Sequence, residues 1–150
     1  MEISAHREKM ARLEDLRSRL DPTDNFELWM WTSMTAVTNG LNACLHHLKL
    51  TQPKPYYPHQ IPGLYVTRGA DGSWVSIFAE PGDVIHLGLP PFEGIIPRAV
   101  SDLSVELEVL EDLREPFVRG GQPITPAVIH RCSVAYEKSI AMIEKILSVG

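Results

Sequence analysis

Apolar residues recur every three or four positions in four stretches of the chain, the spacing that places them on one face of an α-helix. The stretches cover about residues 3–20, 23–50, 97–117 and 125–147. Charged residues fill the remaining positions of the first and third stretches, as on helices with one face in water. The pattern therefore predicts four helices.

Residues typical of helix ends lie between the first and second stretches and between the third and fourth stretches. Asp21-Pro22-Thr23-Asp24 stands between the first and second stretches, and Thr125-Pro126 opens the fourth shortly after Gly120-Gly121. Side-chain oxygens cap helix starts, proline suits the first turn, and glycine ends helices. Since short connections favour antiparallel neighbours, we expect a mainly α protein, a four-helix antiparallel bundle.

The segment between the second and third helices, about residues 51–96, lacks helical periodicity. Leu64–Arg68 and Ser73–Ala79 flank Asp71-Gly72, a strong hairpin signal. We expect a short antiparallel β-hairpin or meander inserted between helices 2 and 3 of a single domain, residues 1–150. Pairing across a two-residue loop would place Leu64, Val66, Val75 and Ile77 on one face and Tyr65, Trp74 and Phe78 on the other. Val84–Leu87 would add a third strand.

Two helices carry features that predict close packing. Gly40 lies inside the apolar second helix, where glycine costs about 1 kcal/mol relative to alanine, so a neighbouring helix should approach closely there. The fourth helix is apolar over a face broader than one neighbour would cover. This helix should lie either at the centre of the bundle or at a subunit interface; we favour the interface, most simply a two-fold homodimer.

Composition and charge exclude several classes of protein. The chain has 150 residues and a formal net charge of −5, which disfavours a nucleic-acid partner because phosphate binding requires basic surfaces. It has no apolar run of the roughly 18 residues that cross a membrane, and no apolar core of a signal peptide near residue 1. We expect no membrane partner and a cytoplasmic location. The two cysteines, Cys44 and Cys132, lie on apolar helical stripes and are expected to be buried and unpaired.

Aromatic residues gather in the second helix and the insertion, which suggests a ligand pocket between them. Trp29 and Trp31 are two residues apart and cannot both face one core, so one of them should meet the insertion. Such a pocket would be apolar with a few polar groups. The preferred interpretation is a non-catalytic module that binds a small apolar ligand or a protein, without a cofactor. The expected ligand-binding residues are Trp29, Trp31, Thr38, His47, Tyr57 and Trp74.

A small metal-dependent enzyme, hydrolase-like in its chemistry, is the alternative. The chain has no nucleophile-elbow, phosphate-loop or zinc-finger motif, but it has six histidines. His46 and His47 are adjacent, so their rings point about 100° apart on a helix and cannot readily share an ion. A divalent metal ion would need three ligands within about 2.0–2.2 Å. The candidates are His46, His47, His86, His130, Asp83 and Glu93, with His47, His86 and His130 as the leading set.

Overall fold

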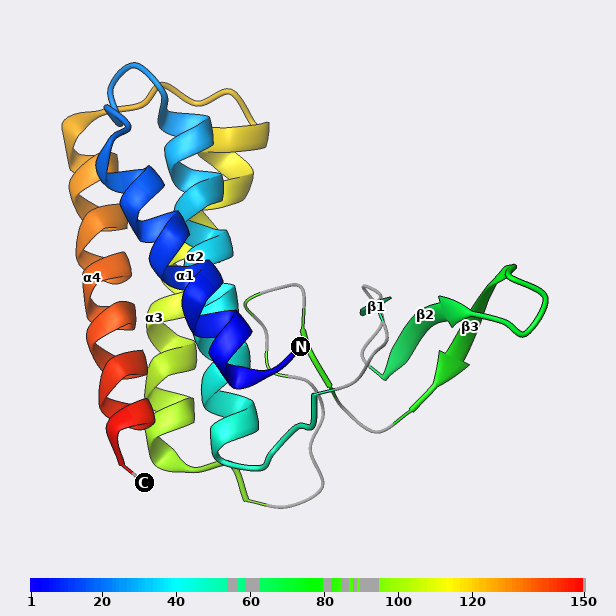
Figure 1. The fold of residues 1–150 in the computed structure, drawn as a ribbon. Coiled ribbons are helices and arrows are strands. Elements are labelled where there is room, and N and C mark those ends of the chain that lie inside the picture. Colours follow the sequence, from blue (N-terminus) through cyan, green and yellow to red (C-terminus); the bar gives the residue numbers. More distant parts are fainter. Residues whose placement is uncertain are drawn as a thin grey trace.

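The computed structural model describes residues 1–53, 57–58, 63–79, 82–84, 87, 89 and 95–149. Within them, α1 (Ile3–Ser18), α2 (Phe26–His47), α3 (Arg98–Arg114) and α4 (Pro126–Ser148) alternate in direction and form an antiparallel bundle (Figure 1). The predicted four-helix bundle is confirmed. The last turn of the third helix, η1 (Glu115–Arg119), is a π-helical turn. It contains Pro116, which lacks the N–H that an α-helical turn would use.

Helix α2 lies at the centre of the packing. It contacts α1, α3 and α4, and every residue from Ala36 to His46 is buried. A helix covered all round is normally apolar, yet this stretch contains Thr38, Asn39, Asn42 and His46. Because buried polar groups need hydrogen-bond partners, these side chains must find them inside the protein.

The close approach predicted at Gly40 is present. A Cβ atom at this position would lie 2.5 Å from Ile143 Cδ1 of α4 and 2.9 Å from Met10 Sδ of α1. Both distances are shorter than a van der Waals contact. The missing side chain of Gly40 therefore allows α1 and α4 to pack closely on α2.

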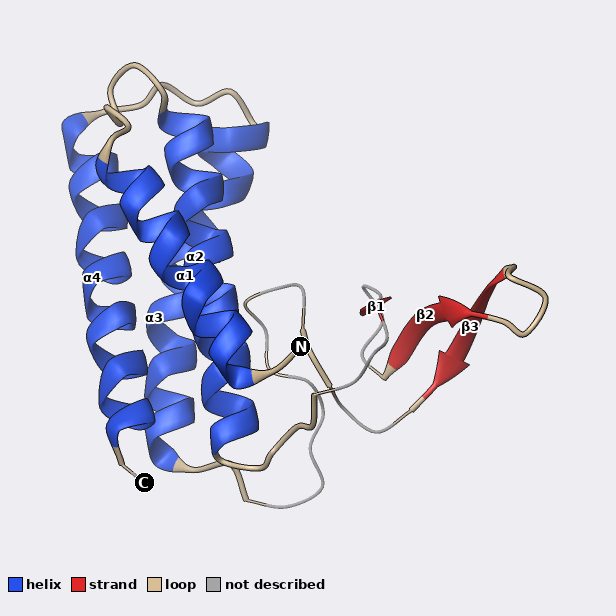
Figure 2. Cartoon of the chain, in the orientation of Figure 1, coloured by secondary structure: helices blue, strands red, loops and turns tan. Residues whose placement is uncertain are grey.

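The insertion contains a three-stranded antiparallel sheet in the order β1-β2-β3. Its strands are β1 (Tyr57–Pro58), β2 (Leu64–Arg68) and β3 (Trp74–Phe78). The β2–β3 hairpin extends away from the helices, as Figure 2 shows. The predicted hairpin is confirmed, but the expected third strand is not, because Val84 and Leu87 lie outside the strands and residues 85–86 lie outside the described part of the chain.

The predicted hairpin register is wrong by one residue. Leu64 pairs with Phe78 and Arg68 with Trp74, so Trp74 and Phe78 share a face with Leu64. The loop is longer than two residues, since the Gly69 N–H donates to the Ser73 carbonyl at 2.8 Å and the Gly72 N–H donates to the Gly69 carbonyl at 3.0 Å. Gly72 has φ 80°, as in hairpins whose turn is followed by a left-handed residue. A shift of one residue moves each side chain to the other face.

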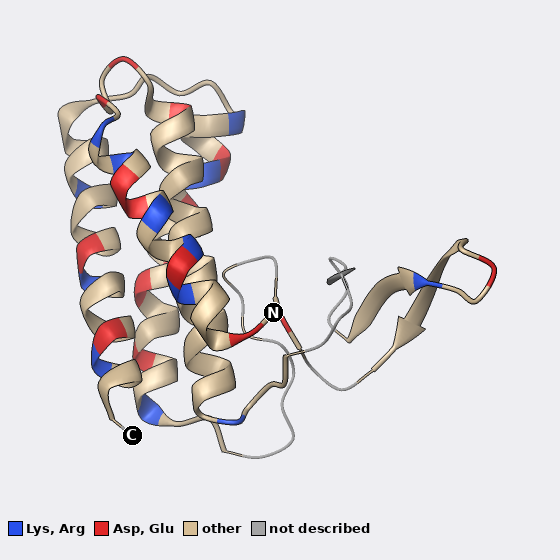
Figure 3. Ribbon diagram, in the orientation of Figure 1, with Lys and Arg blue, Asp and Glu red and all other residues tan. Residues whose placement is uncertain are grey.

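Charged residues of both signs are distributed over the outer faces of the helices (Figure 3). Lys138 Nζ of α4 lies 3.1 Å from Glu106 Oε1 of α3, and Arg7 of α1 lies 3.9 Å from Glu144 of α4. These pairs are exposed and contribute little to stability individually. None of the described helices is long and apolar enough to cross a membrane.

Both cysteines are buried and unpaired, as predicted. Cys44 and Cys132 are 0% exposed, and burial raises the pKa of each thiol to about 12. The thiolate is the reactive form, so we expect negligible reaction of the native protein with a chromogenic disulfide reagent at pH 8. Both thiols should react once denaturant unfolds the chain. Rapid labelling of either thiol without unfolding would contradict this expectation.

Candidate metal site

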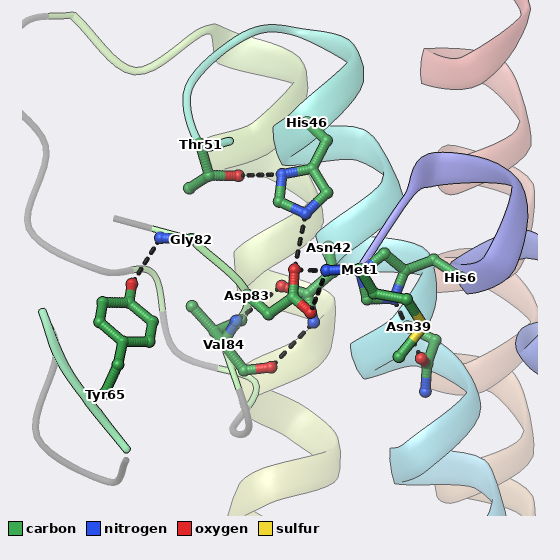
Figure 4. Close-up of polar contacts among 10 residues, drawn as sticks. All are labelled: Met1, His6, Asn39, Asn42, His46, Thr51, Tyr65, Gly82, Asp83 and Val84. Carbon is green, nitrogen blue, oxygen red and sulfur yellow. Dashed lines mark hydrogen bonds and ion pairs between the residues drawn. The ribbon is translucent and has the colours of Figure 1, made fainter. Parts of the chain in front are cut away.

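Asp83 of the insertion lies between two histidines that belong to different helices (Figure 4). Its Oδ1 atom is 2.7 Å from His46 Nε2 and 3.2 Å from His6 Nε2. One potential ligand atom from each of the three residues lies within 4.8 Å of the other two. Both histidine side chains are 1% exposed, whereas that of Asp83 is 12% exposed. The cluster is therefore buried on the bundle side and reaches solvent through Asp83.

The antiparallel arrangement of α1 and α2 brings the two histidines together. His6 lies in the first turns of α1, on the same buried face as Met10, and His46 lies in the last turn of α2. Because the helices run in opposite directions, the start of α1 lies beside the end of α2. Asp83 then comes from the segment that covers this end of α2.

The hydrogen bonds of His6 determine where its lone pair points. Asn39 Nδ2 donates to the Thr35 carbonyl at 2.7 Å, which leaves Asn39 Oδ1, 3.1 Å from His6 Nδ1, as an acceptor. His6 therefore carries a hydrogen on Nδ1 and donates it to Asn39. In the neutral ring, Nε2 then has a lone pair directed at the Asp83 carboxylate. Two acceptors at this distance require a cation between them, either a proton or a metal ion.

His46 has a matching partner on its outer nitrogen. Its Nδ1 atom is 2.7 Å from the hydroxyl oxygen of Thr51, a buried residue just beyond α2. This hydroxyl can accept the Nδ1 hydrogen, which leaves Nε2 available as a ligand atom. Metal-ligating histidines characteristically have such a hydrogen-bonded second nitrogen, because it fixes the tautomer and the ring orientation.

The surroundings of Asp83 favour its carboxylate form. Burial alone would raise its pKa, but hydrogen bonds with His46, His6 and the N-terminal amino group outweigh burial and hold the pKa well below the usual range. The amino group of Met1 is 2.8 Å from Asp83 Oδ2. A depressed folded-state pKa contributes stability above the unfolded value of about 3.9 and loses it as the pH falls further. These causes apply to the protein without an ion; a bound ion would replace the hydrogens between the histidine Nε2 atoms and Asp83.

The three histidines named as metal ligands under the alternative hypothesis, His47, His86 and His130, do not form one site. His47 Nε2 is 2.8 Å from the Val149 carbonyl at the end of α4, whereas His130 is exposed near the start of the same helix. The length of α4 separates His130 from Ser148 by roughly 27 Å, so His47 and His130 cannot share an ion. His86 and Glu93 lie outside the described residues. His46 and Asp83, two of the wider candidates, do converge.

The residues expected to bind a small ligand occupy separate regions. Trp29 is buried in the bundle, with the Arg17 guanidinium 4.3 Å from its ring centroid. Trp74 is 54% exposed on β3, which lies far from the start of α2 in Figure 1. Trp31 is half-buried against the bundle core, and Thr38 donates to the Met34 carbonyl. The Tyr57 side chain lies outside what the structure describes.

The sequence contained a signal for the site that periodicity alone did not reveal. Thr35, Asn39, Asn42 and His46 are spaced by four, three and four residues, which forms a polar stripe on the most apolar helix. Such a stripe indicates a buried polar network. His6 gave no comparable signal, because it occupies one position of an otherwise apolar seam.

Comparisons of the chain with protein-family models, curated proteins and solved structures give no match. Among the described residues, the cluster formed by His6, His46 and Asp83 is the feature whose chemistry indicates a function.

Proposed function

We propose that the chain binds one divalent transition-metal ion through His6, His46 and Asp83 and acts as a small metal-dependent enzyme, hydrolase-like in its chemistry. The observation that carries the proposal is the convergence of two histidine Nε2 atoms on one carboxylate. The outer nitrogen of each ring is hydrogen-bonded to Asn39 or Thr51, as ligand histidines require.

The type and number of ligand atoms favour a catalytic over a structural ion. Structural zinc sites normally use four protein ligands, whereas catalytic sites use three and leave a position for water or substrate. Two imidazole nitrogens and one carboxylate oxygen also match the ligand set of non-haem iron enzymes. A divalent ion at this position would supply a Lewis acid, and the exposed side of Asp83 provides access to it.

The spacing of the ligand atoms is compatible with one ion after a small adjustment. Ligand atoms around a tetrahedral zinc ion lie about 3.3 Å apart, given bond lengths near 2.0–2.2 Å. The two Asp83 contacts, 2.7 and 3.2 Å, are close to this value, and no ligand atom is more than 4.8 Å from another. Small shifts of the three side chains would have to supply the difference.

Because His46 and His47 are neighbours with different contacts, replacing each in turn tests metal binding with a matched control. Calorimetric titration of the metal-stripped protein with zinc should give one equivalent for wild type and for His47→Gln, because His47 bonds to Val149 away from the cluster. His46→Gln removes a proposed ligand and should abolish that binding. Equal zinc affinity of His46→Gln and wild type would contradict the proposed site.

The enzymatic part of the proposal has a separate test. Zinc-loaded and metal-stripped wild type are compared for hydrolysis of p-nitrophenyl acetate and bis(p-nitrophenyl) phosphate. We expect zinc to increase at least one rate and His46→Gln to eliminate the increase. Zinc binding without hydrolysis of either compound would contradict the enzymatic part and leave a metal-binding protein.

The other expectations from the sequence stay proposals. A non-catalytic role in binding a small apolar ligand is supported by the exposed Trp74 of the hairpin. A homodimer through α4 is supported by apolar residues such as Ile129 and Ile140, which the bundle only half buries. A cytoplasmic location also stays a prediction.

A further inference from the structure

The carboxylate of the proposed metal site is held differently from its histidines. His6 and His46 project from helices, which fix their backbones. Asp83 lies in the segment Gly82–Val84, which has no regular secondary structure. A ligand on such a segment is held as precisely as the two histidines only if other contacts fix its backbone.

Asn42 fixes the backbone immediately after Asp83. Its Nδ2 donates to the Val84 carbonyl at 2.8 Å, and the Val84 N–H donates to its Oδ1 at 2.7 Å. The side-chain amide thus pairs with both polar backbone groups of Val84, as a neighbouring strand would. Asn42 is 3% exposed and belongs to α2, one turn before the proposed ligand His46. The contact therefore fixes the backbone next to Asp83 relative to the helix that carries His46.

Tyr65 fixes the backbone immediately before Asp83. The Gly82 N–H donates to the Tyr65 hydroxyl oxygen (Figure 4). Tyr65 is 3% exposed and lies on β2. Asp83 is therefore held from one side by the bundle and from the other side by the hairpin.

We infer, on the basis of the proposed metal site, that Asn42 and Tyr65 are positioning residues that aim the Asp83 carboxylate at His6 and His46. The β-hairpin consequently contributes to metal affinity through the Tyr65 hydroxyl, although none of its residues is a ligand. Without these contacts, the Gly82–Val84 segment has to be ordered when the ion binds, and the entropy lost in that step weakens binding.

Tyr65→Phe is the most direct test because it keeps the buried ring and removes only the hydroxyl. A positioning role predicts that zinc affinity falls about tenfold, the lower end of the effect of outer-shell changes. It also predicts an altered visible absorption spectrum of the cobalt(II)-loaded protein, since this spectrum reports the coordination geometry. A merely structural role predicts a lower melting temperature of the metal-free protein, with unchanged affinity and spectrum.

Tyr136→Phe is the matched control. Tyr136 is also buried, but it lies on α4, and its hydroxyl makes no hydrogen bond among the described residues. We expect this variant to keep the zinc affinity and the cobalt spectrum of wild type. Asn42→Leu, similar in size but unable to pair with Val84, should weaken zinc binding more than Tyr65→Phe does.

The outcomes separate this inference from the proposed function. Absence of zinc binding by wild type would overturn both. The positioning role alone would be overturned if wild type binds zinc and Tyr65→Phe has a zinc affinity within about twofold of wild type and the same cobalt spectrum. If Asn42→Leu fails to fold, Tyr65→Phe and its control decide the question.

Discussion

Replacing Asp83 with asparagine is expected to weaken zinc binding at least about 100-fold, because loss of an outer-shell partner already costs 10–100-fold. The substitution keeps the size of the side chain but replaces the carboxylate between His46 and His6 with a neutral amide, whose remaining oxygen is a weaker ligand. Competition with a chromogenic chelator measures the change. Asp71→Asn is the control, since Asp71 is exposed in the hairpin loop, where its carboxylate accepts hydrogen bonds from Ser73.

In Asp83→Asn, zinc should no longer increase the free energy of unfolding. An ion that binds only the folded chain stabilises it by about 2.7 kcal/mol at 100 times its dissociation constant. For a domain of this size, that free energy corresponds to a rise in melting temperature of roughly 5–11 °C. We expect this rise in wild type and Asp71→Asn but not in Asp83→Asn. An equal zinc-induced rise in Asp83→Asn would show that the ion binds elsewhere.

Gly40→Leu is expected to lower the free energy of unfolding by about 3 kcal/mol, the upper end of the usual cost of overpacking. Even a Cβ atom at this position would lie within 2.9 Å of Met10 Sδ and closer still to Ile143 Cδ1. A leucine side chain would have to separate α2 from α1 and α4. The melting temperature should fall by roughly 6–12 °C.

Gly40→Ala provides the comparison for this variant. The atoms that its Cβ would meet are near the ends of flexible side chains, so they can shift. Alanine also gains about 1 kcal/mol of helix propensity over glycine. We therefore expect a much smaller change than for leucine, measured by chemical denaturation of both variants. A melting temperature of Gly40→Leu equal to that of wild type would contradict the close packing of the three helices.

The helices could be predicted because their signal is local. Apolar spacing identifies the helices, and Thr125-Pro126 marks the start of the fourth one correctly. The start expected near Asp21-Pro22 was wrong, because α2 begins at Phe26 without a side-chain cap. The hairpin register could not be determined in this way. Asp71-Gly72 marks a turn in either register, and the choice depends on the left-handed conformation of Gly72 together with the Gly69–Ser73 hydrogen bond.

The candidate site was only partly predictable. His46 and Asp83 were recognised as possible ligands, but their partner was not, because His6 on an apolar helix face resembles a core residue. Which histidine of the pair at 46–47 faces inward depends on the packing of α1 beside α2. The backbone on either side of Asp83 is bonded to Asn42 and Tyr65, which lie 42 and 17 residues from their partners Val84 and Gly82.

The ligands of the proposed site come from distant parts of the chain, so a bound ion would also act as a reversible cross-link. Asp83 is 37 residues from His46 and 77 residues from His6. An ion joining them would close two large loops, with an entropic cost that grows only slowly with loop length. Removal of the ion would release this cross-link and leave the segment around Asp83 held by the hydrogen bonds of Asn42 and Tyr65. Metal supply would thus change how firmly the insertion is tethered to the helices and, with it, the stability of the folded chain.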